Sequence, residues 1–220
     1  MTDNVRLTHS FSALKTFQNC ALRYYYERIS KEVKDTGNAA TIWGNRVHSM
    51  LENRLKGTDQ VPADHPEWEV LCNMFEQLPG TLHTELEMTL TEQLEPTGWW
   101  ADDAWMRLKA DVLVVNAPTA LVADWKTGKR RPDFDQLELT ALMTFKFFPE
   151  VDEVKACFVW LNDLQMDSET YTRAQAPALW EKFLTKTRRI EMAQENNIWP
   201  ANPSGLCNWC SAQHMCKYRR

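Results

Sequence analysis

Four of the six cysteines constrain this chain more than any other residues. Cys20 stands alone near the start, and Cys207, Cys210 and Cys216 follow together near the end, in the run SGLCNWCSAQHMC. A CxxC pair with a third cysteine close behind is typical of metal ligation, and a site of four thiolates needs one more ligand. We predict that Cys20 supplies it. The metal would then tie the two ends of the chain together and contribute folding free energy directly.

Zinc and an iron–sulfur cluster both accept four thiolates, and the spacing alone discriminates poorly between them. Zinc ribbons usually pair two short CxxC knuckles, whereas one ligand here lies far upstream of the other three, which favours a 4Fe–4S cluster. His214, between the last two cysteines, is a possible zinc ligand that we interpret as a bystander. Cys72 and Cys157 lie in apolar segments and are predicted to be buried packing residues.

Disulfides are the other use of cysteine. The run MTDNVRLTHS does not have the pattern of a signal peptide, and no apolar run is long enough to cross a bilayer. We therefore expect a cytoplasmic protein whose thiols stay reduced and no membrane partner.

The net charge of −5 has the wrong sign for binding nucleic acid by bulk charge. Such binding would have to depend on a local basic patch or on bound divalent cations.

The periodicity of the apolar residues predicts helices first and a sheet in the centre. One helix over 7–29 carries Cys20, and a second over 40–55 places Ile42, Val47, Met50 and Leu51 along one side. An α/β fold with a single domain over 1–220 follows, comprising a helical part (1–80), a core (81–175) and a helix with the Cys-rich tail (176–220). The remaining predicted elements are a helix at 66–78, strands at 81–91, 105–115 and 120–128, a helix at 134–148, strands at 153–162 and 169–174, and a helix at 177–196.

Two central strands carry the residues suited to chemistry. Asp111 stands where the apolar run VLVV begins, and Asp124 precedes Lys126 by two positions, so the carboxylate and the ammonium point to one face. Two carboxylates from adjacent strands suit Mg²⁺ or Mn²⁺, and a nearby lysine can orient a nucleophile and stabilise charge on a phosphate. A surface ion pair between Asp124 and Lys126 is the alternative interpretation.

The surroundings of this pair favour the functional interpretation. His48, in the second helix, is a candidate third metal ligand. Gln136, at the start of the helix that follows the strand, points to the same end of the sheet. A basic run follows Lys126 and is a candidate DNA contact; it consists of Lys129, Arg130 and Arg131.

Taken together, these motifs resemble a known family. Their order along the chain is SxFxxCxxRYYYE, GNRVH, KAD, DWKTGK, Gln136 and a final CxxCx5C, and it resembles the RecB-like branch of the PD-(D/E)XK nucleases from about residue 8 to 217. Within that branch it is similar to members with an iron–sulfur staple, such as the CRISPR-associated exonucleases and the AddB nuclease domain. The resemblance implies a restriction-endonuclease-like mixed sheet flanked by helices, with the tail closing around a 4Fe–4S cluster held by Cys20, Cys207, Cys210 and Cys216.

The resemblance also implies roles for individual residues. His48, Asp111, Asp124 and the backbone carbonyl of Trp125 would bind Mg²⁺ or Mn²⁺, and Lys126 would position or activate the attacking water. Gln136 would orient Lys126 or a DNA phosphate. A glutamate on the preceding strand is expected as well, and we favour Glu85 slightly over Glu87.

Two functions from different classes follow. The first is a metal-dependent exonuclease that acts on single-stranded DNA or DNA ends, in recombination and repair, phage replication or CRISPR adaptation, with the partner proteins of one of those systems. The second is a DNA-end-binding module with little or no catalysis, held together by an iron–sulfur or zinc staple. Thr140, which replaces an aromatic residue often found four positions after Gln136 in the family, is the feature that makes the second function conceivable.

Overall fold

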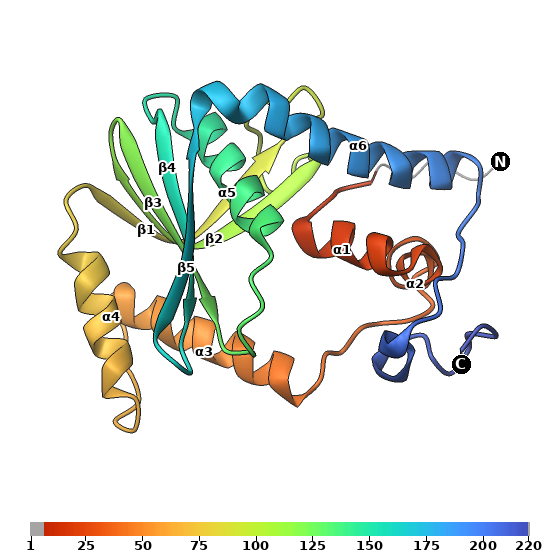
Figure 1. Ribbon diagram of the computed structural model, residues 1–220, viewed down its shortest axis with the longest axis horizontal. Coiled ribbons are helices and arrows are strands. Elements are labelled where there is room, and N and C mark those ends of the chain that lie inside the picture. The colour runs from red at the N-terminus through yellow and green to blue at the C-terminus, as the bar shows by residue number, and fades with distance from the viewer. Residues whose placement is uncertain (1–6, 220) are drawn as a thin grey trace. The chain divides into compact units, whose positions relative to one another are not determined.

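The computed structural model describes residues 7–219 and has an α/β fold. Helices form the first part of the chain and a mixed sheet the middle (Figure 1). The elements are α1 (Phe11–Asn19), α2 (Ala21–Tyr24), α3 (Ala39–Leu55), α4 (Pro66–Glu76), β1 (Thr81–Leu90), β2 (Met106–Asn116), β3 (Thr119–Lys126), α5 (Phe134–Phe147), β4 (Glu153–Trp160), β5 (Gln165–Thr172) and α6 (Ala176–Glu195).

The chain divides into two compact units. Unit 1 contains the described residues up to 37 and those from 181 onward, and unit 2 contains residues 38–180. Unit 1 therefore unites segments from both ends of the chain, with α1 and α2 from one end and the Cys-rich tail from the other. The expectation that the whole chain is one domain, divided near residues 80 and 175, stays a prediction.

The sheet of unit 2 has five strands in the order β1-β2-β3-β4-β5. The pairs β1–β2, β2–β3 and β4–β5 are antiparallel, whereas β3 and β4 are parallel. The long connection between β3 and β4 holds α5, as parallel neighbours require. This arrangement confirms the predicted α/β order and the mixed sheet.

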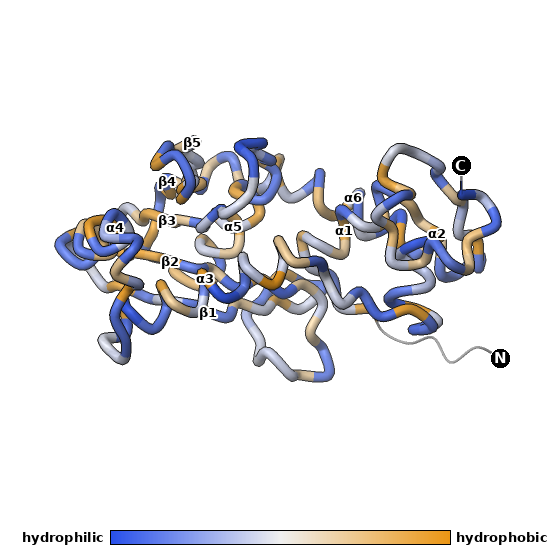
Figure 2. The backbone as a smooth tube through the Cα atoms, turned by 90° about the horizontal axis from the view of Figure 1, so that it is seen from below, coloured by the Kyte–Doolittle hydropathy of each residue, from blue (hydrophilic) through white to orange (hydrophobic). Residues whose placement is uncertain are grey.

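Helices cover both faces of the sheet. On one face, α3 and α4 pack on strand residues such as Val112, Trp125 and Val159. On the other face, Phe134 of α5 contacts Phe158, with 6.4 Å between ring centroids. Residues from 137 to 145 of α5 are all buried. In Figure 2, hydrophobic colouring follows β2 and β3 in the middle of the sheet, which is where these two layers meet it.

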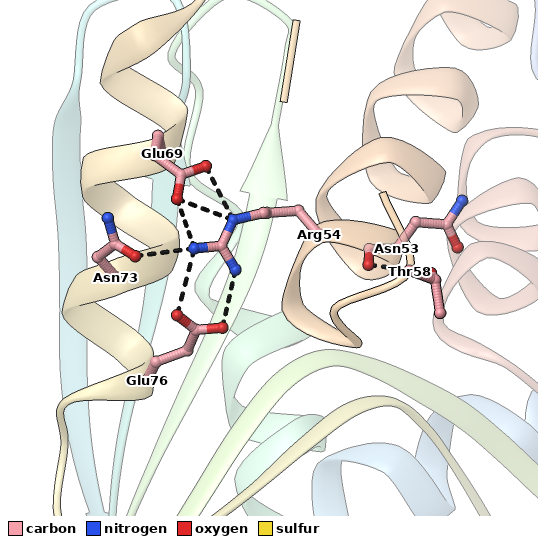
Figure 3. A network of polar contacts seen from close by, with 6 residues as sticks. All are labelled: Asn53, Arg54, Thr58, Glu69, Asn73 and Glu76. Atoms are coloured by element: carbon pink, nitrogen blue, oxygen red, sulfur yellow. Dashed lines mark hydrogen bonds and ion pairs between the residues drawn. The ribbon is translucent and has the colours of Figure 1, made fainter. Parts of the chain in front are cut away.

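Arg54, near the end of α3, ties that helix to α4 (Figure 3). Its Nε donates to Glu69 Oε2 at 2.8 Å, its Nη1 donates to Glu76 Oε1 at 2.8 Å, and its Nη2 donates to Asn73 Oδ1 at 2.8 Å. These bonds raise the pKa of the guanidinium above its ordinary value, because two carboxylates favour its charged form. The contact fixes α3, the helix that carries His48.

The single helix predicted over 7–29 is wrong in one respect that bears on function. Cys20 has extended backbone angles (φ −165°, ψ 110°) and separates α1 from α2. The tail supplies partners at this break: Leu22 N donates to Pro200 O at 3.2 Å, and Asn202 Nδ2 donates to Asn19 O at 2.9 Å. Helical spacing of apolar residues continues through the break, so periodicity could not reveal it.

Cys72 and Cys157 are buried, as predicted, at 0% and 3% exposure. The prediction that Ile42 shares one side of its helix with Val47 and Leu51 is wrong. The side chain of Ile42 is 62% exposed, whereas Val47 and Leu51 are fully buried. The last predicted strand, 169–174, is longer and starts earlier, at Gln165. No helix among residues 7–219 is long and apolar enough to cross a membrane.

Candidate active site

The candidate site lies in unit 2 where β2 and β3 separate. The ladder between these strands ends at Val112 and Ala123, although β2 continues beside β1 and β3 continues beside β4. Asp111 and Asp124 are the next residues in the register, so they face each other across the opening. Asp111 Oδ2 accepts a hydrogen bond from Trp125 N at 2.9 Å, which satisfies a backbone donor that the divergence would otherwise leave free.

His48 reaches the opening from α3. Its Nε2 lies 2.9 Å from Trp125 O, and its Nδ1 lies 3.3 Å from Asp111 Oδ1. Burial acts to lower the pKa of His48, but the hydrogen bond and the charge of Asp111 outweigh it, so the pKa is raised. The imidazole and the Trp125 carbonyl therefore stand beside the Asp111 carboxylate, and their role as metal ligands stays a prediction. Gly44, one turn earlier, allows the approach of α3, because a Cβ there would lie 3.2 Å from Thr127 Oγ1.

Glu85 joins this group from β1. Pairing between β1 and β2 is intact on both sides of it, at Thr84–Val112 and Leu86–Ala110, so Glu85 stands opposite Asp111. Its φ of 51° is in the left-handed region, which costs a non-glycine residue about 1–3 kcal/mol. Lys109 Nζ lies 2.9 Å from Glu85 Oε2 and partly neutralises it.

Ligand atoms of His48, Glu85 and Asp111 all lie within 4.8 Å of one another. Among residues 7–219, these three side chains form the group of potential ligands that is compact enough to hold a metal ion. Two carboxylates and an imidazole fit a divalent cation such as Mn²⁺, with water completing the shell. Glu87 is exposed and outside the group, which supports the choice of Glu85.

Asp124, Lys126 and Gln136 form an adjoining cluster. Lys126 Nζ lies 2.6 Å from Asp124 Oδ2 and donates to Gln136 Oε1 at 3.0 Å, while Gln136 Nε2 donates to Asp124 Oδ1 at 2.6 Å. Burial raises the pKa of Asp124 to about 6, and the charge of Asp111 adds to this effect. Asp124 is not part of the three-residue group, whereas Glu85 is. Metal binding by His48, Asp111, Asp124 and the Trp125 carbonyl stays a prediction.

The basic run after Lys126 is only partly available to a ligand. Arg130 Nε donates to Asp167 Oδ2 at 2.8 Å, and the same oxygen accepts from Trp160 Nε1 at 2.8 Å. Lys129 and Arg131 are exposed. DNA binding by the three residues stays a prediction.

The four predicted cluster ligands lie in unit 1 and line one cavity: Cys20, Cys207, Cys210 and Cys216. All four are free and partly exposed. Backbone N–H groups of Asn202 and Ser204 donate to the sulfurs of Cys20 and Cys207 at 3.4 and 3.3 Å. In the described chain no three of these sulfurs come within 4.8 Å of one another, so the sulfurs share a cavity but are not gathered around one point.

Lys109 is a residue of the site that the sequence interpretation missed. It lies two positions before Asp111 in β2, and residues two apart in a strand share a face. The same rule that paired Asp124 with Lys126 would have found it. Its ion pair with Glu85 raises its pKa.

Comparison with known proteins gives a family and a fold. Residues 8–217 match the model of the PD-(D/E)XK nuclease superfamily. The fold is similar to the crystal structure of SSO0001, with 16% identity, a TM-score of 0.53, and 97% of this chain and 87% of that chain covered. It is also similar to that of a "putative exonuclease" from Eubacterium rectale, with 13% identity, a TM-score of 0.57, and 99% and 91% covered. No curated protein matches the sequence.

Proposed function

The chain belongs to the PD-(D/E)XK nuclease superfamily, and on that premise we propose that it is a divalent-metal-dependent deoxyribonuclease that hydrolyses phosphodiester bonds. One observation carries the proposal: His48, Glu85 and Asp111 come together where β2 and β3 separate, beside the ion pair of Asp124 and Lys126. Exonuclease action on single-stranded DNA or DNA ends is the finer form of the proposal. The name of the Eubacterium rectale structure is consistent with it.

The donor set fits a divalent cation. Asp111 and Asp124 face each other across the opening, and their repulsion contributes to the raised pKa of Asp124. A cation between the strands would relieve that repulsion, so the site favours one. We propose His48, Glu85 and Asp111 as ligands, with Asp124 and the Trp125 carbonyl at the edge of the site. When bound, Mg²⁺ or Mn²⁺ would acidify a water molecule and neutralise negative charge on the phosphate.

Lys126 is the residue that we propose for handling the nucleophile. Its ammonium has three donors, of which Asp124 and Gln136 engage two. The third can hold a water molecule or a phosphate oxygen in place while charge develops on the phosphate. Phe158 lies under the ammonium, at 5.0 Å from the ring centroid, and limits where it can move.

Gln136 positions Lys126. Its side-chain amide accepts from Lys126 with one end and donates to Asp124 with the other. Rotation of either charged group would break one of these bonds. We therefore propose that Gln136 acts on the reaction through its neighbours, and its two hydrogen bonds support this role.

A cleavage assay tests this function. End-labelled single-stranded and duplex DNA, incubated with Mn²⁺ or Mg²⁺, should be cut by the wild-type protein, and EDTA should stop the reaction. Asp111→Asn should remove cleavage while the protein stays folded, because the change keeps the hydrogen-bond acceptor and removes the charge. Equal cleavage by wild type and Asp111→Asn would refute the assignment. Binding of DNA without any cleavage would support the alternative, a DNA-end-binding module.

We further propose that unit 1 holds a 4Fe–4S cluster on the four cysteines that line its cavity. Four thiolates around one zinc ion, at about 2.3 Å each, lie about 4 Å apart. In a 4Fe–4S cluster each thiolate binds a different iron, so the ligands stand further apart. The support for this proposal is that all four cysteines line one cavity. Their sulfurs are not gathered closely enough for a four-thiolate zinc site, and the larger cluster would have to bind them from its four irons. On the same ground we propose that the chain belongs to the branch with a C-terminal iron–sulfur staple.

The cluster has a direct chemical test. Protein purified without oxygen should be brown and contain iron and acid-labile sulfide in equal amounts. Cys207→Ser should lose both, whereas His214→Ala should keep them if His214 is a bystander. A colourless protein that contains zinc would overturn this part of the proposal and leave the nuclease site untouched.

A further inference from the structure

The loop between β1 and β2, residues 91–105, is ordered by hydrogen bonds of its own. Thr97 N donates to Thr89 O at 2.9 Å, and Thr97 Oγ1 donates to Asp103 Oδ1 at 2.8 Å. At its far end, Trp105 N donates to Leu90 O at 2.8 Å. These hydrogen bonds order the backbone of the loop in the free protein. A ligand that binds at the loop would therefore cost little further conformational entropy of the backbone.

Two tryptophans at this tip contact one arginine. The guanidinium of Arg107 lies 5.5 Å from the centroid of the Trp99 ring and 5.1 Å from that of the Trp100 ring. Arg107 Nε is buried and has no hydrogen-bond partner. Trp100 is nevertheless 82% exposed, the largest exposed fraction of any large hydrophobic residue in the described chain. The loop therefore presents a large aromatic surface to solvent beside a cation.

This cluster shares a face of the sheet with the candidate active site. Arg107 and Asp111 lie four positions apart on β2, so both side chains project from the same face, with Lys109 between them. At about 3.4 Å per residue, the two positions are about 14 Å apart. A strand of DNA at a duplex rise of 3.4 Å per nucleotide covers that length in about four nucleotides, and an extended strand needs fewer.

We propose that Trp100, supported by Trp99 and Arg107, is a stacking platform for an unpaired base of the DNA strand whose phosphate lies at the candidate active site. The platform gives the substrate class: single-stranded DNA, or the frayed end of a duplex. This inference rests on the proposed nuclease function.

The chemistry of the platform suits a nucleobase better than a protein partner. Proteins that bind single strands stack bases on aromatic rings, add cationic contacts from arginine, and do so without sequence preference. A base offers its flat surface only where the strand is unpaired and unstacked, which excludes the interior of a duplex. The net charge of −5 has the wrong sign for holding DNA by bulk charge, so local contacts such as this one and bound cations would have to supply the affinity.

Binding without cleavage tests the platform directly. A fluorescein-labelled oligothymidylate, titrated with protein in Ca²⁺ to suppress hydrolysis, should bind Trp100→Ala about 5- to 100-fold more weakly than wild type. Trp100→Phe keeps a ring and should lose less. Val70→Ala, a change of another exposed apolar residue in unit 2, should bind like wild type. Unchanged affinity of Trp100→Ala, or no binding of the oligonucleotide by wild type, would overturn the inference.

An abasic scan identifies the partner of the ring. Oligonucleotides with one abasic position should include one that binds wild type about as weakly as the intact strand binds Trp100→Ala. For that oligonucleotide, Trp100→Ala should cause no further loss, because the two changes remove the same contact. Equal, additive losses at every abasic position would show that the ring does not stack on a base.

A small substrate separates failure of the platform from failure of the nuclease. Bis(p-nitrophenyl) phosphate has a phosphodiester bond but is too short to reach the loop. With Mn²⁺, Trp100→Ala should hydrolyse it at the wild-type rate, while its KM for the oligonucleotide rises and its kcat stays the same. The wild-type protein could bind oligonucleotides through Trp100 and yet hydrolyse neither substrate. This result would contradict the proposed function but not the stacking role of Trp100.

Discussion

The two candidate metal regions of this protein are built in different ways. In unit 2, Asp124 and Lys126 pair with β4, Asp111 lies in β2 between two residues paired with β1, and His48 belongs to a helix packed on that sheet. In unit 1, Cys20 lies in the break between two short helices, and Cys207 and Cys210 lie at a short 3₁₀ turn, Gly205–Trp209. Paired strands and a packed helix position the first set. The second set shares a cavity, with few hydrogen bonds to define where each sulfur points.

This difference indicates what a bound metal would contribute in each unit. A cation in unit 2 would enter an arrangement that exists already, so its main contribution would be chemical. A cluster in unit 1 would tie segments from both ends of the chain, so its main contribution would be to stability. Loss of the ligand should therefore affect activity in unit 2 and folding in unit 1.

The largest effect is expected from Cys207→Ser. The variant should lose on the order of 5 kcal/mol from unit 1, a part of the ~10 kcal/mol that a structural metal can supply to a small domain. Hydrogen exchange should show faster exchange in α1 and α2 and unchanged protection in β2 and β3. If the amides of α1 keep their protection, the cluster does not hold unit 1 together. His214→Ala is the matched control.

The next effect is expected from Lys126→Ala. Loss of one donor aimed at a developing charge lowers kcat by about 10²- to 10³-fold in other enzymes, and we expect a loss of that size here. Thermal stability should fall as well, because Asp124 loses the cation that offsets its burial, so kcat is measured below the melting temperature of the variant. The control is Lys155→Ala, an exposed lysine on β4. A variant with wild-type kcat would show that the Asp124–Lys126 pair is only a surface ion pair.

The burial of His9 predicts that the stability of unit 1 falls in acid. It is 1% exposed, and burial lowers its pKa to about 4. Between pH 6.5 and 4 the imidazole of the unfolded chain takes up a proton that the buried imidazole does not, so the contribution of His9 to stability is constant above pH 6.5 and falls as the pH drops through this window. The total loss should be about 3 kcal/mol. Urea unfolding at several pH values should show this slope in wild type and a smaller one in His9→Gln; an identical slope in both would contradict the assignment.

Gln136→Ala should have the smallest effect. The variant keeps every charge of the site but frees Lys126 and Asp124 from their shared partner, and we expect kcat to fall about tenfold, because small displacements of catalytic groups are costly. Gln136→Glu adds a negative charge beside Asp124 and should reduce kcat further. A pH profile separates positioning from folding: the rate of Gln136→Ala should depend on pH differently from that of wild type. A profile that is only scaled down would point to partial unfolding.

Much of the fold and of the nuclease site could be predicted from the sequence. Strand periodicity predicted that Asp124 and Lys126 share a face, and their 2.6 Å contact confirms it. The order of elements and the buried Cys72 and Cys157 followed from apolar patterning. These features depend on local repeats of two or about four residues, which a sequence displays directly.

Other features could not be predicted, because they depend on contacts between distant residues. The helix break at Cys20 is stabilised by hydrogen bonds to residues 200–202, about 180 positions away. The choice between Glu85 and Glu87 depends on the left-handed φ of Glu85 and on the end of the β2–β3 ladder. Arg130 pairs with Asp167 on β5, which no spacing rule connects to the basic run.

Binding of Mn²⁺ to metal-free protein tests the central claim most directly. Titration followed by electron paramagnetic resonance, which detects free Mn²⁺, should show saturable binding in wild type that is weakened at least tenfold in Asp111→Asn and in Glu85→Gln. Glu92→Gln, an exposed glutamate in the same unit, should bind like wild type. Equal binding by wild type and Asp111→Asn would contradict the claim that the opening between β2 and β3 is a metal site.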